Sequence, residues 1–206
     1  MRRRTGLGFT LAGAGLVAAL VGCAPAASEE PAPTDSGAPV ATPTPTTDAP
    51  VVPVFRQPAR CADLLGAATT ARFAAEGRDL LGGPGGVYGG EYFAEDTFEE
   101  SLGGITCVWG DEDDLASTVV ISVTPVSIAT RSTIVGDLLG RGLIESEIEG
   151  ALTYSQIGDE VAAQAQFSVL REDSWVSVLQ AIGGEDRFQE ATELVDEVTE
   201  RIYVAE

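Results

Sequence analysis

Residues 163–182 read AQAQFSVLREDSWVSVLQAI, and this stretch predicts two adjacent strands joined by a turn. Ala163, Ala165, Phe167 and Val169 occupy alternate positions, so they line one face of the first strand. The polar residues 171–174 form the turn, and the apolar run 175–182 forms the partner strand. Gly183 and Gly184 then end the second strand.

A helix over about 185–203 is predicted directly after this hairpin. Its apolar residues recur at steps of three and four, which gives a stripe that packs on a sheet. The stripe consists of Phe188, Ala191, Val195, Val198 and Ile202. Glu185 and Asp186 stand in the first turn, where acidic side chains suit the helix dipole.

The same patterns extend toward the N-terminus. Alternation predicts strands at 105–109 and 119–123, with a weaker one at 152–156. Helical spacing is found at 61–68, 71–81 and 128–139, and the glycine-rich stretch 82–90 indicates a loop. We therefore expect an α+β fold: a mostly antiparallel sheet with helices packed on one face and one disulfide.

The first 23 residues have the parts of a secretory signal. Arg2, Arg3 and Arg4 precede an uncharged apolar run, 6–22, that is short for a membrane span. The segment ends in Leu20-Val-Gly-Cys23, which resembles the lipobox of bacterial lipoproteins. This resemblance implies cleavage after residue 22 and acyl chains on Cys23, which would anchor the protein stably. The alternative is an ordinary secreted protein in which Cys23 is incidental.

The next segment, 23–53, is predicted to be a tether that follows the lipidated cysteine. Residues 24–53 hold eight of the 11 prolines and no aromatic residue. Such a composition cannot bury a core and favours extended conformations. Residues 54–206 are long enough for a single extracytoplasmic domain.

The charge balance excludes one class of partner. The chain has 12 basic residues, all arginine, against 32 acidic ones, a net charge of −20. Loss of 1–22 removes three of those arginines and no acid, which leaves −23. Nucleic-acid binding needs a basic face, so we expect no nucleic-acid partner. Anionic headgroups would repel this surface too, so contact with the membrane is assigned to the acyl chains on Cys23.

The remaining cysteines, Cys61 and Cys107, form an even pair. Outside the cytoplasm such a pair favours a disulfide, and two free thiols are the alternative.

Several motifs taken together resemble a family of actinobacterial cell-surface lipoproteins of unknown function. They are Cys61-Ala-Asp-Leu64-Leu65, Cys107-Val-Trp109 and Ile157-Gly-Asp-Glu-Val-Ala162, followed by a strand pair and a terminal helix. The resemblance implies a Cys61–Cys107 disulfide and an extracytoplasmic location. The domain is also distantly similar to extracellular sensor domains of mycobacterial receptor kinases. No catalytic activity follows from either resemblance.

No catalytic or metal site stands out in the sequence. The chain has no histidine, which excludes a Ser-His-Asp or Cys-His nucleophilic site and histidine metal ligands. The acidic run 111–114 lacks the ligand spacing of an EF-hand, and 82–90 lacks the ending of a P-loop. We therefore predict no cofactor, no metal and no enzymatic activity.

The segment 82–104 is the candidate ligand loop. It combines glycines with four aromatic residues that no helical or strand period places in a core: Tyr88, Tyr92, Phe93 and Phe98. Plain structural slack is the alternative. The expected function is a lipid-anchored, non-catalytic binding or sensing module at the extracytoplasmic face of the cell membrane, with an envelope protein, glycan or lipid as partner. A carrier of an apolar ligand and a carboxylate-based glycan hydrolase are the alternatives.

Overall fold

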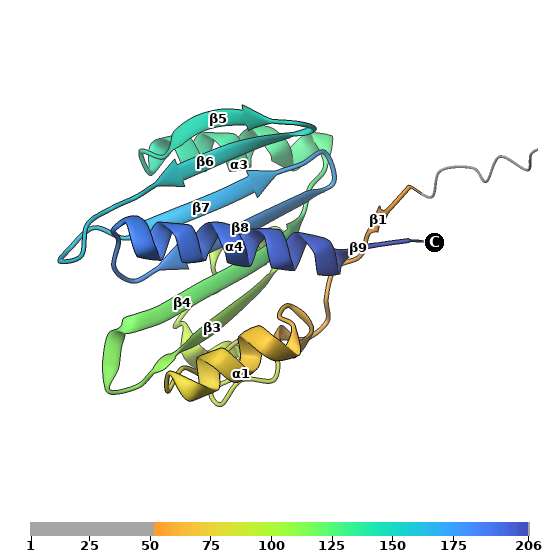
Figure 1. The fold of residues 1–206 in the computed structure, drawn as a ribbon. Coiled ribbons are helices and arrows are strands. Elements are labelled where there is room, and N and C mark those ends of the chain that lie inside the picture. The colour runs from red at the N-terminus through yellow and green to blue at the C-terminus, as the bar shows by residue number, and fades with distance from the viewer. Residues whose placement is uncertain (1–51, 206) are drawn as a thin grey trace, which may run out of the picture. The chain divides into compact units, whose positions relative to one another are not determined.

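A seven-stranded sheet lies at the centre of residues 52–205, the part of the chain that the computed structural model describes (Figure 1). The strand order is β2-β3-β4-β8-β7-β6-β5, and every neighbouring pair is antiparallel. The strands are β2 (Asp79–Gly82), β3 (Ile105–Asp111), β4 (Asp114–Pro125), β5 (Ile144–Ile148), β6 (Ala151–Gln156), β7 (Ala165–Leu170) and β8 (Ser174–Gln180). This arrangement confirms the predicted α+β class with a mostly antiparallel sheet.

Four α-helices and two short 3-10 helices accompany the sheet in the described residues. They are η1 (Cys61–Asp63), α1 (Ala67–Ala75), η2 (Gly90–Tyr92), α2 (Phe98–Ser101), α3 (Ile128–Gly140) and α4 (Glu185–Ile202). Two short strands, β1 (Val54–Phe55) and β9 (Tyr203–Val204), pair antiparallel in a separate ribbon. Within residues 52–205, no helix has both the length and the apolar character needed to cross a bilayer. The predicted signal peptide 1–22, Cys23 and the tether up to residue 51 lie outside the described residues.

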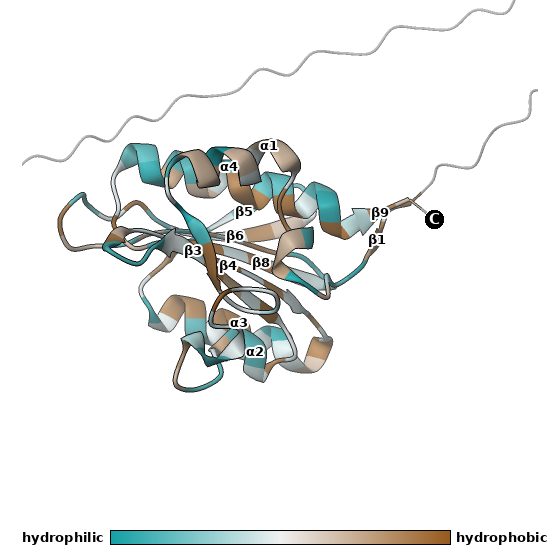
Figure 2. Cartoon of the chain, turned by 90° about the horizontal axis from the view of Figure 1, so that it is seen from below, coloured by the Kyte–Doolittle hydropathy of each residue, from teal (hydrophilic) through white to brown (hydrophobic). Residues whose placement is uncertain are grey.

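One face of the sheet carries the larger apolar core. The alternating residues of β3 and β4, with Val176 and Val178 of β8, point toward the side that α1 and α4 cover (Figure 2). The predicted stripe of α4 is buried there from Ala191 to Ile202. Because both the strand period and the helix period are local, the sequence predicted this half of the fold correctly.

The helices lie on both faces of the sheet, which corrects the expectation that they pack on one face. Figure 2 shows α1 and α4 on one side of the sheet and α2 and α3 on the other. Successive residues of a strand point to opposite faces, so Leu170 and Trp175 leave apolar surface on the second face. Ile134 and Leu138 of α3 cover this surface in a second core cluster.

The Cys61–Cys107 disulfide is present and joins η1 to β3, with 5.6 Å between the Cα atoms. Both cysteines are fully buried in the core on the α1/α4 face. Gly83 passes directly over the bond with φ +90°, where a Cβ would lie 2.6 Å from the Sγ of Cys61 and 2.2 Å from the carbonyl oxygen of Thr106. A glycine is therefore required at this point of the loop.

Local boundaries differ from the sequence prediction at two places. The spacing over 61–68 suggested one helix, but the chain is extended at Gly66, with ψ 163°, and α1 begins after it. The helical pattern over 71–81 stops at Ala75, because Gly77 takes φ +76° and turns the chain into β2. The short strands β2 and β5 were not predicted.

Candidate functional site

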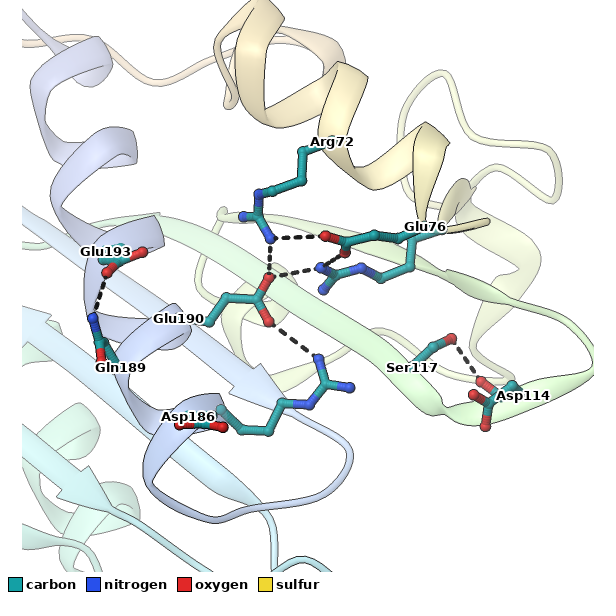
Figure 3. Close-up of a pocket in the computed structure, with 10 residues that line it drawn as sticks. Arg72, Glu76, Asp114, Ser117, Asp186, Gln189, Glu190 and Glu193 are labelled. Atoms are coloured by element: carbon teal, nitrogen blue, oxygen red, sulfur yellow. Dashed lines mark hydrogen bonds and ion pairs between the residues drawn. The ribbon is translucent and has the colours of Figure 1, made fainter.

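A cluster of charged residues tethers α1 to α4 (Figure 3). Its centre is Glu190 of α4, whose side chain is 12% exposed. Glu190 accepts hydrogen bonds from Arg72 of α1 at 2.6 Å, from Arg78 at 2.7 Å and from Arg187 at 3.2 Å. Gln180 of β8 donates to the same carboxylate at 3.0 Å. We call these five residues the Glu190 cluster.

The charges of the Glu190 cluster pair with one another and hold α1 against α4. Burial by itself would raise the pKa of Glu190, but hydrogen bonds from Arg78 and Arg72 outweigh it and lower the pKa to about 2. Arg78 is 4% exposed, lies 4.0 Å from the ring centroid of Phe73 and pairs with Glu76 as well. Arg72, Arg78 and Arg187 are thus paired with carboxylates of the protein itself. A buried ion-pair network of this kind holds the elements that carry it in one relative position.

The hollow beside the Glu190 cluster does not fit an anionic ligand. It measures about 650 Å³. Three arginines and five acidic residues line it. The acidic residues are Glu76, Asp114, Asp186, Glu190 and Glu193. There is no surplus of positive charge to attract a phosphate or carboxylate. We assign the Glu190 cluster to stability.

The second face of the sheet is different, because four hydroxyl side chains stand in register across its middle. Thr106 of β3 lies opposite Ser122 of β4, Ser122 opposite Ser177 of β8, and Ser177 opposite Ser168 of β7. All four are at most 4% exposed. We call them the hydroxyl row. On most sheets such residues would face solvent, but here α2 and α3 lie on that side (Figure 2), and Phe93 and Thr97 come close to the row from the chain before α2.

A hollow of about 190 Å³ lies over the hydroxyl row, and we call it the polar hollow. Its apolar lining is Phe93, Val120 and Leu179. Its polar lining comes from six strands and helices or their ends: Thr97, Glu99, Thr106, Ser122, Arg141, Gln166 and Ser177. A few convergent polar groups in a partly apolar concavity are typical of a small-molecule site.

Hydrogen bonds hold the floor of the polar hollow in place. The hydroxyl of Thr106 lies 2.8 Å from that of Thr97 and 3.2 Å from that of Ser122. Ser177 accepts from Ser168 at 2.9 Å and from the amide of Gln166 at 3.2 Å. These buried polar groups support one another, which preorganises the floor.

The wall of the polar hollow carries an ion pair between α2 and the end of α3. Glu99 is 12% exposed and lies 3.7 Å from a guanidinium nitrogen of Arg141. Burial raises the pKa of Glu99, and the residue's own backbone N–H and Arg141 oppose this only in part. Thr97 caps α2 through a capping box with Glu100, and this fixes the start of the helix that presents Glu99.

The four predicted loop aromatics do not form one surface. Tyr88 is 47% exposed and donates from its hydroxyl to Glu112 at 2.6 Å. Tyr92 lies between Tyr88 and Phe93, with ring centroids 6.3 Å and 5.1 Å away. Phe93 is 36% exposed at the rim of the polar hollow. Phe98 packs on Trp175 at 6.0 Å and belongs to the second core.

The sequence analysis missed the polar residues of this site. Ser122, Ser168 and Ser177 each stand between two apolar residues of a strand, which is the pattern of a solvent-exposed face. The serines were therefore visible in the sequence, but serines that alternate with apolar residues are ordinarily interpreted as solvent-exposed. Glu99 had no signal at all among so many acids.

The other sequence candidates have structural roles. The acidic run 111–114 forms the β3–β4 hairpin, where Asp111 accepts from the backbone of Asp113 at 2.9 Å. Asp159 of the 157–162 motif accepts from three successive backbone N–H groups, which lowers its pKa and closes that turn. Within residues 52–205 no group of three acidic or cysteine side chains is arranged to hold a metal ion.

No protein-family model, curated protein or solved structure is significantly similar to this chain. The resemblance to actinobacterial cell-surface lipoproteins therefore stays a prediction.

Proposed function

We propose that this chain is a lipoprotein anchored through Cys23 at the extracytoplasmic face of the membrane, and that its domain is a non-catalytic binding or sensing module of the cell envelope. The observation that carries the binding role is the polar hollow. Its hydroxyls, amide and ion pair converge from separate elements and are held by hydrogen bonds, although apolar residues at the same positions would pack at less cost.

The chemistry of the polar hollow favours binding over catalysis. Its serines have no histidine to activate them, since the chain contains none. Glu99 is the one carboxylate among its lining residues, whereas glycoside hydrolysis uses a pair that flanks the bond. Its polar floor and small volume also do not favour a lipid carrier.

The anchor is tested by replacing Cys23 with serine and fractionating cells. The variant should move from the membrane pellet to the soluble extracytoplasmic fraction, since a serine cannot carry the thioether. The variant Ser36→Ala in the tether serves as control and should stay in the pellet. A Cys23→Ser chain that pellets like the wild type would refute the anchor.

The binding role is tested by native mass spectrometry of the full chain purified from its own host. We expect a retained small molecule, and Ser122→Leu, which fills the polar hollow, should abolish it. The matched control is Ser146→Leu on the exposed strand β5, which should keep the adduct. Turnover of an envelope glycan that is lost in Glu99→Gln would instead show an enzyme.

A further inference from the structure

We infer that the polar hollow binds a small organic ammonium compound of the amino-alcohol or amino-sugar type. Its ammonium group pairs with Glu99 and its hydroxyl oxygens contact Ser122 and Ser177. The inference rests on the proposed binding function, because it names the ligand class of that same site.

Glu99 has only a distant side-chain partner for its charge. The nearest cation within the described residues, Arg141, stands 3.7 Å away, which is beyond hydrogen-bond distance. That guanidinium is already engaged by Asp137, at 2.5 Å from one nitrogen and 2.8 Å from another. The other group that stabilises the carboxylate is the backbone N–H of Glu99 itself. A largely buried carboxylate with one distant cation, shared with Asp137, has acceptor positions left, so the site favours a ligand that supplies a further charged donor.

The floor of the polar hollow offers hydroxyl groups that can each form a further hydrogen bond. Ser177 accepts two hydrogen bonds, and its own hydrogen has no acceptor among the described residues. Ser122 is bonded to Thr106 alone within the same part of the chain. The two serines lie directly opposite each other on β4 and β8 with no bond between them. An oxygen atom of a ligand can thus accept from both.

Charge and size restrict the ligand further. The chain carries a net charge of −20, and Asp137 offsets Arg141 beside the polar hollow, so the local field favours a cation. The volume of about 190 Å³ corresponds to about six waters at their share of liquid volume. A monosaccharide or smaller compound fits this space, with its carbons against Phe93, Val120 and Leu179.

The pairing predicts a direction for the pH dependence. The ammonium ligand needs an ionised Glu99. Burial and the charge of Asp137 raise the pKa of Glu99, whereas its own backbone N–H and Arg141 lower it, with burial outweighing them. Affinity should therefore be highest between the pKa of Glu99 and the pKa of the ligand's ammonium group. It should fall as the pH drops through the first value or rises through the second.

The test uses two pairs of probes that differ in one charged group: glucosamine against glucose, and ethanolamine against ethylene glycol. Each is titrated into the full chain and followed by calorimetry or by chemical-shift changes. We expect the ammonium member of each pair to bind at least tenfold tighter. Glu99→Gln should abolish this preference, and Glu95→Gln, the same change at an exposed position of the same segment, should retain it. Ser122→Leu should abolish binding of both members.

Three results would overturn the inference. One is equal or tighter binding of the neutral probes, which would reject the ligand class but leave the polar hollow as a binding site. Another is an ammonium preference that survives in Glu99→Gln, which would place the cation elsewhere. The third is no binding of either ammonium probe while the host-derived adduct depends on Ser122. Loss of the proposed function itself would appear separately, as an adduct unaffected by Ser122→Leu or as no adduct at all.

Discussion

The two faces of the central sheet are built from the same strands but differ in chemistry. Ile121 and Ser122 are neighbours in β4, and both are at most 4% exposed. Ile121 points into the apolar core under α1 and α4, whereas Ser122 belongs to the hydroxyl row under the polar hollow. Burial alone therefore does not define an apolar core, because one buried face is apolar and the other keeps polar groups.

The two faces therefore differ in how much they contribute to stability. The α1/α4 face holds the disulfide, the Glu190 cluster and the larger apolar cluster, all of which stabilise the native state. The α2/α3 face has a smaller apolar cluster, where Leu170 and Trp175 meet α3. The rest of that face includes buried hydroxyl groups, whose hydrogen bonds contribute little net stability. Four predictions test this difference.

The largest effect is expected from removing the disulfide on the α1/α4 face. Replacing Cys61 and Cys107 with alanine opens a loop with a sequence separation of 46. The chain-entropy model gives a loss of about 4 kcal/mol in the free energy of unfolding. Denaturant titration measures it, with Cys23→Ser as the control that keeps the disulfide. An unchanged midpoint would mean that this face does not depend on the bond.

The neighbours Ile121 and Ser122 give the most direct comparison of the two faces. Ile121→Ala should cost about 3 kcal/mol, since it leaves a cavity in a tightly packed core. Ser122→Ala removes one hydrogen bond and should cost about 1 kcal/mol. Both values come from the same denaturant series. Equal losses would remove the distinction between the faces.

The Glu190 cluster should make the α1/α4 face sensitive to acid. Because the pKa of Glu190 is lowered from 4.5 to about 2, its contribution is present above the unfolded pKa and is lost as the pH falls through that interval. Glu190→Gln should cost about 2 kcal/mol at neutral pH, because Arg72 and Arg78 lose the buried carboxylate that they share. The variant should also lose less stability than the wild type on acidification.

The control for this prediction is Glu193→Gln on the exposed side of α4. It should change neither the stability at neutral pH nor its acid dependence. An acid response identical in Glu190→Gln and the wild type would contradict the assignment.

The smallest stability effect is expected on the polar face. The double variant Thr106→Val and Ser122→Ala replaces both partners of a buried hydrogen bond with apolar groups. Thr97 loses its bond to Thr106 but still accepts from the backbone N–H of Glu100, so stability should change by less than about 1 kcal/mol. Binding of the ammonium probes should nevertheless be lost. A loss of several kcal/mol would show that the hydroxyl row is structural.

The sequence determined what depends on short-range pattern. The alternation in 105–109, 119–123 and 165–169 fixed the strands and which residues share a face, and the spacing in 188–202 fixed the last helix and its buried stripe. The even pair Cys61 and Cys107 fixed the disulfide. These features rest on the periods of helix and strand and on cysteine count, which can be read along the chain.

Only the tertiary structure decided what covers the second face and which side chains meet there. Ser122 and Ser177 have the same sequence context as serines on a solvated face, and it is the packing of α2, α3 and residues 93–97 that buries them. Glu99 and Arg141 come together across 42 positions of the chain, and Arg78 and Glu190 across 112. Such contacts depend on how distant elements pack, and local periodicity carries no information about that packing.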